Sequence, residues 1–251
     1  MATTAACGRL PGTKPEPLPS VSPVPPGSPG APSNPGAPLP SLGPLPDGQA
    51  LLKAVRAKVA NTPGVDVEVK AASSGHYYGG KKVAELRSSS SRSRMLWGAP
   101  GKLRAQVLES TTPLLAGSTL VMLSPDQLKV KAGGALGLIP ISMKSSDTRL
   151  MTNRNHYFTD NHPVAHLKRL TAEGASWKGV APLPVAPSAA WVEISGVRRL
   201  DKDLTRELLA LDPKTLQPKA MAMMEGDKSV VTFQFLKFLW DAVPNPNAFK
   251  L

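Results

Sequence analysis

The sequence predicts a mainly β fold of the α+β class, on three observations. Three apolar runs near the C-terminus, residues 204–211, 218–225 and 229–241, are separated by short gaps containing Asp, Pro, Gly and Lys. Such gaps form tight turns, and short connections join antiparallel neighbours because a parallel crossover needs about a dozen residues or more. Upstream, residues 65–71 and 103–107 alternate between apolar and polar side chains, as half-buried strands do. Residues 47–60 and 161–172 instead carry apolar residues at helical spacing.

The last strand of this meander changes its apolar face along its length. The apolar side chains lie first on one face and later on the other: Val231, Phe233 and Phe235, then Leu236, Phe238 and Trp240. A β-bulge near the change, or burial on both faces, would account for it. Residues 244–249 then form a proline-stiffened exit with an aromatic anchor at Phe249.

Two helices are expected. Asp47 can cap the first helix, and residues 61–64 end it with Asn, Pro and Gly. Its apolar stripe predicts a plug packed on the sheet, with a membrane-surface helix as the alternative: Leu51, Leu52, Val55 and Val59. Pro163 suits the first turn of the second helix, whose stripe is Val164, Leu167 and Leu170, and Gly174 ends it.

The connecting stretches are read from their composition. A turn is expected at residues 75–80, and the serine-rich residues 88–91 suggest a loop or a weak edge strand. Residues 175–188 contain three prolines and suggest a loop. Residues 131–143 are apolar, rich in glycine and interrupted by Pro140, which favours a mobile flap or else a buried loop.

The N-terminal part differs in composition from the rest. Fourteen of the 27 prolines fall in residues 8–46, where apolar residues are too sparse to offset the entropy of ordering. We therefore expect a disordered tether at residues 1–46 and one folded domain at residues 47–251. Most of the net charge of +12 belongs to the domain, which favours anionic partners such as lipid headgroups, nucleic acid or acidic proteins.

Cys7 is the only cysteine, so no internal disulfide forms. The small residues before it resemble the end of a bacterial lipoprotein signal, although the apolar segment that should precede them is missing. Cys7 is therefore a candidate lipidation site at the head of the tether, and a free thiol is the alternative.

Three segments also resemble the LolA-like outer-membrane lipoprotein-sorting proteins. They are ELLALDPKTLQPKAMAMMEGDKSVVTFQFLKFLWDAVPNPNAF at residues 207–249, WGAPGKLR at residues 97–104, and VMLSP at residues 121–125. The resemblance extends over nearly all of residues 47–251 and implies a half-open antiparallel β-barrel, closed by an N-terminal helix and a short central helix or flap, whose interior holds acyl chains. The carrier proteins of this family have an arginine that bonds the lid from inside the barrel, and Ala99 stands at that position here.

Motifs for catalysis are missing. The sequence has no Gly-x-Ser-x-Gly, no His-Glu-x-x-His, no phosphate loop and no cysteine pair for zinc, so we expect no enzyme and no cofactor. His156, Asp160, His162 and His166 could be metal ligands, but capping and surface roles are favoured and no metal is expected. A basic run could bind polyanions, but no nucleic-acid-binding motif accompanies it, and a solvated hairpin face is favoured: Lys81, Lys82, Arg87, Arg92, Arg94, Lys102 and Arg104.

Methionine adapts to irregular apolar space, and the chain has eight of them. Together with medium-sized apolar residues on the predicted strands, they suggest a lipid-binding interior, or else an ordinary closed core. The candidate residues are Leu103, Val107, Leu120, Met122, Met221, Met223, Val231, Phe233 and Phe235.

The sequence therefore predicts a non-enzymatic lipid- or lipoprotein-binding protein of the bacterial envelope, in the periplasm. We expect a monomer that binds acyl chains and contacts the membrane through a lipid anchor on Cys7 and a basic face. Two alternatives stay open: an interaction or sensor module of the same fold, and a polyanion or nucleic-acid binder.

Overall fold

The computed structural model describes residues 44–99, 101–112, 115–124, 126–133 and 139–251. The tether up to residue 43, the candidate lipidation site Cys7 and the centre of the predicted flap lie outside these residues. The described residues begin at residue 44, three residues before the predicted start of the domain.

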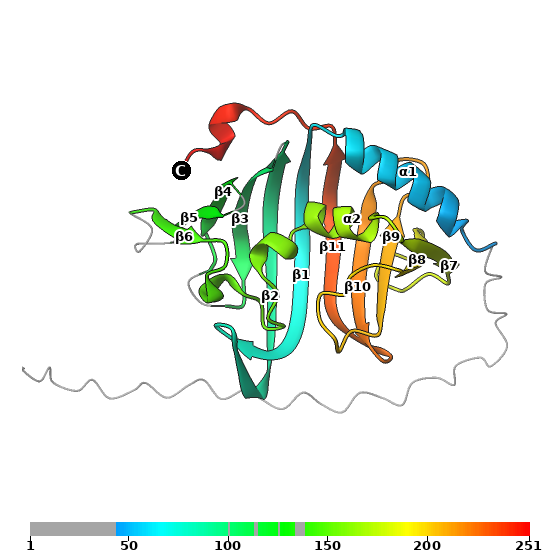
Figure 1. The fold of residues 1–251 in the computed structure, drawn as a ribbon, viewed down its shortest axis with the longest axis horizontal. Helices are drawn as coiled ribbons and strands as arrows, with labels where there is room; N and C mark the ends of the chain where they lie inside the picture. The colour runs from blue at the N-terminus through cyan, green and yellow to red at the C-terminus, as the bar shows by residue number, and fades with distance from the viewer. Residues whose placement is uncertain (1–43, 100, 113–114, 125, 134–138) are drawn as a thin grey trace, which may run out of the picture. The chain divides into compact units, whose positions relative to one another are not determined.

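The described residues form one antiparallel sheet of eleven strands in the order β6-β5-β4-β3-β2-β1-β11-β10-β9-β8-β7 (Figure 1). The sheet does not close, because β6 and β7 end it on opposite sides. The last strand along the chain pairs with the first, so β1 and β11 hold the two halves together. The strands are β1 (Gly64–Tyr78), β2 (Lys81–Gly98), β3 (Lys102–Ser110), β4 (Thr119–Ser124), β5 (Gln127–Lys131), β6 (Ile141–Lys144), β7 (Ser176–Val180), β8 (Ala190–Ser195), β9 (Arg206–Leu211), β10 (Pro218–Glu225) and β11 (Lys228–Trp240).

This architecture confirms the mainly β, half-open prediction, and the meander β9–β10–β11 lies where the apolar runs placed it. A register shift between Glu68 and Val69 of β1 leaves Leu236 as an extra residue in β11. Phe238 therefore returns to the face of Phe233 and Phe235, and the predicted bulge explains the change of pattern.

Four stretches differ from the expectation. Residues 75–78, expected in a turn, continue β1, so that the turn is confined to Gly79 and Gly80. Residues 88–91 are not a loop but belong to the long β2, where they pair with β1; only Ser91 also pairs with β3. Residues 176–180 form the edge strand β7 in place of a loop, and residues 141–143 at the end of the predicted flap belong to β6. Serine and glycine disfavour strands only weakly once neighbouring strands supply hydrogen bonds, so pairing overrides the local preference.

Two helices, α1 (Gly48–Asn61) and α2 (Pro163–Leu170), lie in front of the same face of the sheet (Figure 1). We call this the inner face. Asp47 caps α1 by accepting hydrogen bonds from the backbone N–H groups of Gln49 and Ala50, as predicted. Both predicted stripes contribute to the core with the strands: Leu52 and Val55 from α1, and Val164, Leu167 and Leu170 from α2. Neither helix has the length and apolar character needed to cross a membrane.

A long connection, residues 145–162, leads from the edge strand β6 to α2, and we call it the strap. It contains two 3-10 turns, η2 (Thr148–Leu150) and η3 (Phe158–Asp160). Leu150 and Phe158 pack against the core of the inner face. The strap therefore links the β6 side of the sheet to the side on which the helices lie.

The outer face carries charges and one separate apolar cluster. Asp66 accepts hydrogen bonds from Arg94 and from Lys237 (Lys237 Nζ to Oδ2, 2.9 Å). Burial opposes ionisation of Asp66, but these two bonds outweigh it and lower the pKa of the carboxyl group. Residues 181–189 cover the apolar cluster, and the chain ends in η4 (Pro246–Phe249), whose Phe249 is buried against Gly98 as the predicted anchor.

Candidate functional site

The inner face of β10 and β11 is packed under α2. Met221, Met223 and Phe233 are at most 3% exposed, and they share one core with the apolar residues of both helices. The ring of His166 lies 5.2 Å from that of Phe233. A row of rings continues along β11, from Phe233 through Phe235 and Phe238 to Trp240. Five predicted lipid-binding residues lie in this packed half: Met221, Met223, Val231, Phe233 and Phe235.

The other four predicted residues lie on β3 and β4, also on the inner face. Leu103 pairs directly with Met122, and both are buried. Leu120 and Val107 are only half-buried. The register therefore places all nine candidates on one face of the sheet, whereas their contact with a lipid stays a prediction.

The inner face toward β6 is less covered than the part under α2. Half-exposed apolar side chains follow one another across neighbouring strands, and Ile141 on β6 is 57% exposed. We call this set the open row: Met95, Val107, Leu120, Val130, Ile141 and Met143. The sequence prediction included only Val107 and Leu120 of this row, since the partners on β2, β5 and β6 become neighbours only through strand pairing.

A cleft of about 380 Å³ opens where α1 and α2 meet the end of β2. We call it the rim cleft. Its apolar wall is made by Val59, Ala60, Trp97 and Ala99. Thr62 and Thr171 add hydroxyl groups that are already bonded, to Gly64 O and Leu167 O respectively. Arg56 and Lys168 are the two charged residues of the lining.

These two cations are placed by the helices that carry them. Arg56 of α1 donates hydrogen bonds to the carbonyl oxygens of Thr171 (2.7 Å) and Ala172 (2.8 Å), at the C-terminal end of α2. Cations are favoured there because the carbonyl ends of a helix are unsatisfied and partly negative. Lys168 Nζ lies 4.7 Å from the centre of the Trp97 ring, in a cation–π contact.

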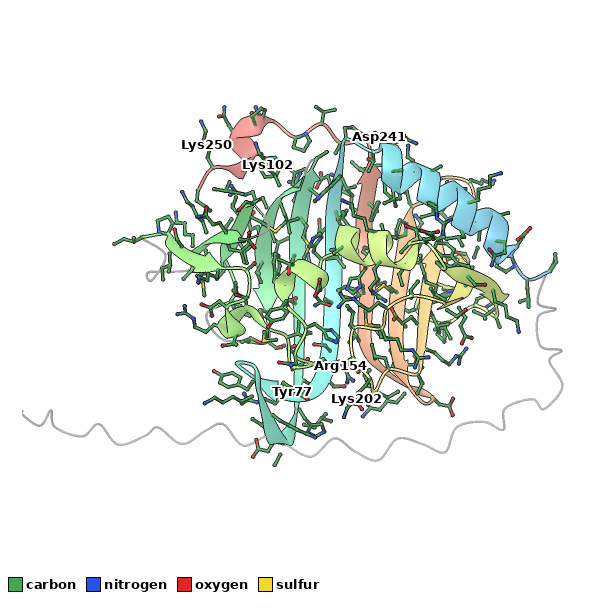
Figure 2. The ribbon with its side chains drawn as sticks, in the orientation of Figure 1. Tyr77, Lys102, Arg154, Lys202, Asp241 and Lys250 are labelled. Carbon is green, nitrogen blue, oxygen red and sulfur yellow. The ribbon has the colours of Figure 1, made fainter. Side chains whose placement is uncertain are left out.

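Buried polar groups fasten the strap. Arg154 is 7% exposed and donates hydrogen bonds to Asp201, to Glu225 and to the carbonyl oxygen of Ser74. Figure 2 shows Arg154 close to Tyr77, at the end of the sheet opposite Asp241. Burial opposes ionisation of Asp201, but the bonds from His156 and Arg154 outweigh it and lower the pKa of the Asp201 carboxyl.

The histidines of this region are not at the surface as expected, because His156, His162 and His166 are all buried. The capping role is confirmed for His162, whose Nδ1 accepts a hydrogen bond from the backbone N–H of Ala165 at the start of α2. Burial, helped by the charge of Lys168, lowers the pKa of His162 to about 4. Burial also lowers the pKa of His166 well below its usual range.

Carboxylate oxygens of Asp201, Asp203 and Glu225 lie within 4.8 Å of one another. Arg154 already binds two of these three side chains, which accounts for the cluster without an ion.

The basic run of the sequence is divided by the fold. Arg92 and Arg94 pair with Glu68, Glu109 and Asp66, and Arg104 donates to the carbonyl oxygens of Ala248 and Lys250. Figure 2 shows Lys102 and Lys250 at the same end of the domain, far from the Tyr77 end of the β1–β2 hairpin. Each of the three arginines is therefore paired with a carboxylate or hydrogen-bonded to main-chain carbonyl oxygens.

No protein-family model matches the sequence, and no curated protein matches it. Solved structures with related folds include an uncharacterized conserved protein from Thermus thermophilus, with 11% sequence identity, a TM-score of 0.47 and coverage of 81% of this chain and 92% of that one. An outer membrane lipoprotein-sorting protein domain from Vibrio parahaemolyticus has 8% identity, a TM-score of 0.40 and coverage of 81% of this chain and 96% of that one. A LolA superfamily protein from Nitrosomonas europaea has 10% identity, a TM-score of 0.32 and coverage of 78% of this chain and 94% of that one. The last two carry the name of the family that the sequence resembles. With TM-scores below 0.5, we take no function from these likenesses.

Proposed function

We propose that the protein binds an acyl chain on the inner face of its half-barrel, without catalysis. The observation that carries this proposal is the open row, a set of half-exposed apolar side chains on a face that is otherwise a closed core. Apolar sites with few polar groups suit hydrocarbon, and methionines at positions 95 and 143 can adapt to a chain of varied shape.

The strap and the sheet supply the two walls of the proposed site. Leu150 and Phe158 of the strap pack on the same core as Met95 and Leu120 of the sheet. A chain lying between them is shielded from water, and each buried CH₂ contributes about 0.8 kcal/mol. The five predicted lipid-binding residues under α2 lie beside this site on the same face and would not contact the chain.

Binding of a fluorescent fatty acid tests this proposal. In Leu120→Gln an unpaired amide would face the chain, at a cost of about 1–3 kcal/mol, so affinity should fall about tenfold. Leu123→Gln is the matched control, because Leu123 lies on the same strand outside the open row and is 40% exposed. Circular dichroism verifies the fold of both variants. Equal affinities of both variants and the native protein, or no saturable binding at micromolar probe, would reject the proposal.

We also propose that the protein belongs to the bacterial envelope and is anchored through a lipid on Cys7. The support is the position of the cysteine at the head of a proline-rich segment, which can span on the order of 100 Å in extended form. Membrane fractionation of the full precursor and of its Cys7→Ser variant decides this point, since an unchanged distribution argues against the anchor.

A further inference from the structure

We infer that the rim cleft makes the protein selective for anionic amphiphiles, with the carboxylate or phosphate head held by Lys168 and Arg56 and the chain passing Trp97. This inference rests on the proposed acyl-chain binding and adds the class of ligand. Three observations support it: the positive charge of the cleft, the absence of an acidic partner for either cation among the described residues, and the continuity of the cleft with the inner face.

The cleft is unbalanced in charge. Arg56 and Lys168 line it, and none of the described lining residues is acidic. Within the part of the chain that the structure describes, Arg56 bonds only to main-chain carbonyl oxygens, which leave its positive charge without a carboxylate. Among the described residues, Lys168 forms no ion pair and its ammonium group rests on the Trp97 ring. An anion in this cleft would therefore meet two cations that have no competing acidic partner there.

Lys168 can move to a ligand at little cost. A cation–π contact at an exposed site contributes only about 0.5–1 kcal/mol, and the lysine stem is flexible with three donors at its end. Arg56 is held in place by its two hydrogen bonds, and a fixed donor loses less entropy on binding. Rotation of Lys168 toward an anionic head would also uncover the face of Trp97 for the first carbons of the chain.

Trp97 connects the cleft to the inner face. It pairs across the sheet with Leu103, and Leu103 pairs with Met122. Ala105 and Leu120, the next inner-face pair on the same two strands, lead on to the open row. A volume of about 380 Å³ lies within the range of roughly 300–1,000 Å³ that small-molecule sites occupy. The cleft thus has room for a head group, and an apolar path leads away from it.

Calorimetric titration with three ligands of one chain length separates the head from the chain: dodecanoate and dodecyl phosphate below their micelle concentrations, and dodecanol below its solubility limit. A charge-assisted hydrogen bond predicts that both anions bind at least about tenfold tighter than the alcohol. The difference should shrink at high salt, because the cleft is open to solvent. In Lys168→Gln most of the anion preference should be lost, because only Arg56 remains and it already donates to two carbonyl oxygens, whereas Lys168→Arg should keep the preference.

Lys53→Gln is the matched control, since Lys53 is an exposed lysine of α1 outside the cleft lining. Equal binding of all three ligands to the native protein would overturn the inference and leave acyl-chain binding standing. An anion preference that is undiminished in Lys168→Gln, or that is lost equally in Lys53→Gln, would overturn the assignment to the rim cleft. Displacement of dodecyl phosphate by the same concentration of inorganic phosphate would overturn the selectivity for amphiphiles and show a simple anion site. Absence of binding by all three ligands would overturn this inference and the proposed function together.

Discussion

The two halves of the inner face are built from the same alternation of apolar residues but differ in cover. Under α2, Phe233 is 3% exposed, whereas Leu120, on the same face nearer β6, is half-exposed. The difference arises from where the helices are fastened. Trp177 of β7 donates to the carbonyl oxygen of Leu170, and Arg169 of α2 binds Glu207 of β9. Both anchors lie on the β7–β9 side, so the helices close one half as a core and leave apolar surface on the other.

The largest expected effect is a direct comparison of the two halves. Phe233→Ala should lower the free energy of unfolding by about 3–5 kcal/mol, because it leaves a cavity between β11 and α2. Leu120→Ala should cost less than about 2 kcal/mol, since part of this side chain already contacts solvent. Urea unfolding of both variants measures the difference. Similar losses in the two variants would mean that the open row is as tightly packed as the core.

The next prediction concerns the ion pair that fastens α2. Glu207 is 4% exposed, and Glu207→Gln would leave Arg169 buried without its carboxylate, at a cost of about 3 kcal/mol. The double variant Arg169→Met, Glu207→Leu should recover most of the loss, because an apolar pair of similar size avoids the desolvation of two charges. Urea unfolding of the single and double variants tests this. A double variant as unstable as the single one would argue that the pair contributes more than charge balance to the packed half.

Acid should loosen the packed half specifically. The pKa of His162 falls from 6.5 to about 4 in the folded protein, so the unfolded chain takes up the proton first as pH falls. The stability from neutral His162 is complete above pH 6.5 and is lost as pH falls toward 4, by on the order of 3 kcal/mol. His166 acts in the same direction. Unfolding free energies at pH 7, 5.5 and 4.5 should therefore decline.

His162→Asn, which can still cap α2, should flatten this decline, and the exposed His76 replaced by Asn should not. A decline of equal size in the native protein and in both variants would assign the acid sensitivity to other groups.

The smallest expected effect concerns the strap, which spans the two halves. Asn153 donates through Nδ2 to the carbonyl oxygens of Ser73 and Arg87, both at 3.0 Å. Asn153→Ala should cost only about 1 kcal/mol, because the buried Oδ1 of Asn153 has no partner among the described residues and its removal offsets part of the loss. Faster amide exchange of Tyr77, whose N–H donates to the carbonyl oxygen of Asn153, would accompany it. Unchanged exchange would mean that the remaining contacts of the strap hold it in place without the side chain of Asn153.

Local sequence patterns predicted the structure correctly where the interacting residues are close together in the sequence. The turns after Leu211 and Glu225, the cap at Asp47 and the stripe of α2 need only adjacent residues, and each was predicted correctly. Residues 88–91 and 176–180 were misread because their serines and glycine carry little strand preference, and only their pairing with β1 and with β8 makes them β. The exposure of the histidines was also predicted wrongly, since their burial depends on tertiary contacts with β11 and within the strap.

By itself, the sequence determined the mainly β class, the C-terminal meander, and which apolar side chains of a single strand share a face, because alternation along a strand decides which of its side chains lie together. Only the tertiary structure decided which of them are closed in a core and which form the open row, since that depends on where α1 and α2 dock. It also decided that Arg56, Trp97 and Lys168, from three separate elements, line one cleft. No local sequence pattern brings these three residues together, because their proximity arises from the packing of helices on a sheet in which β1 pairs with β11.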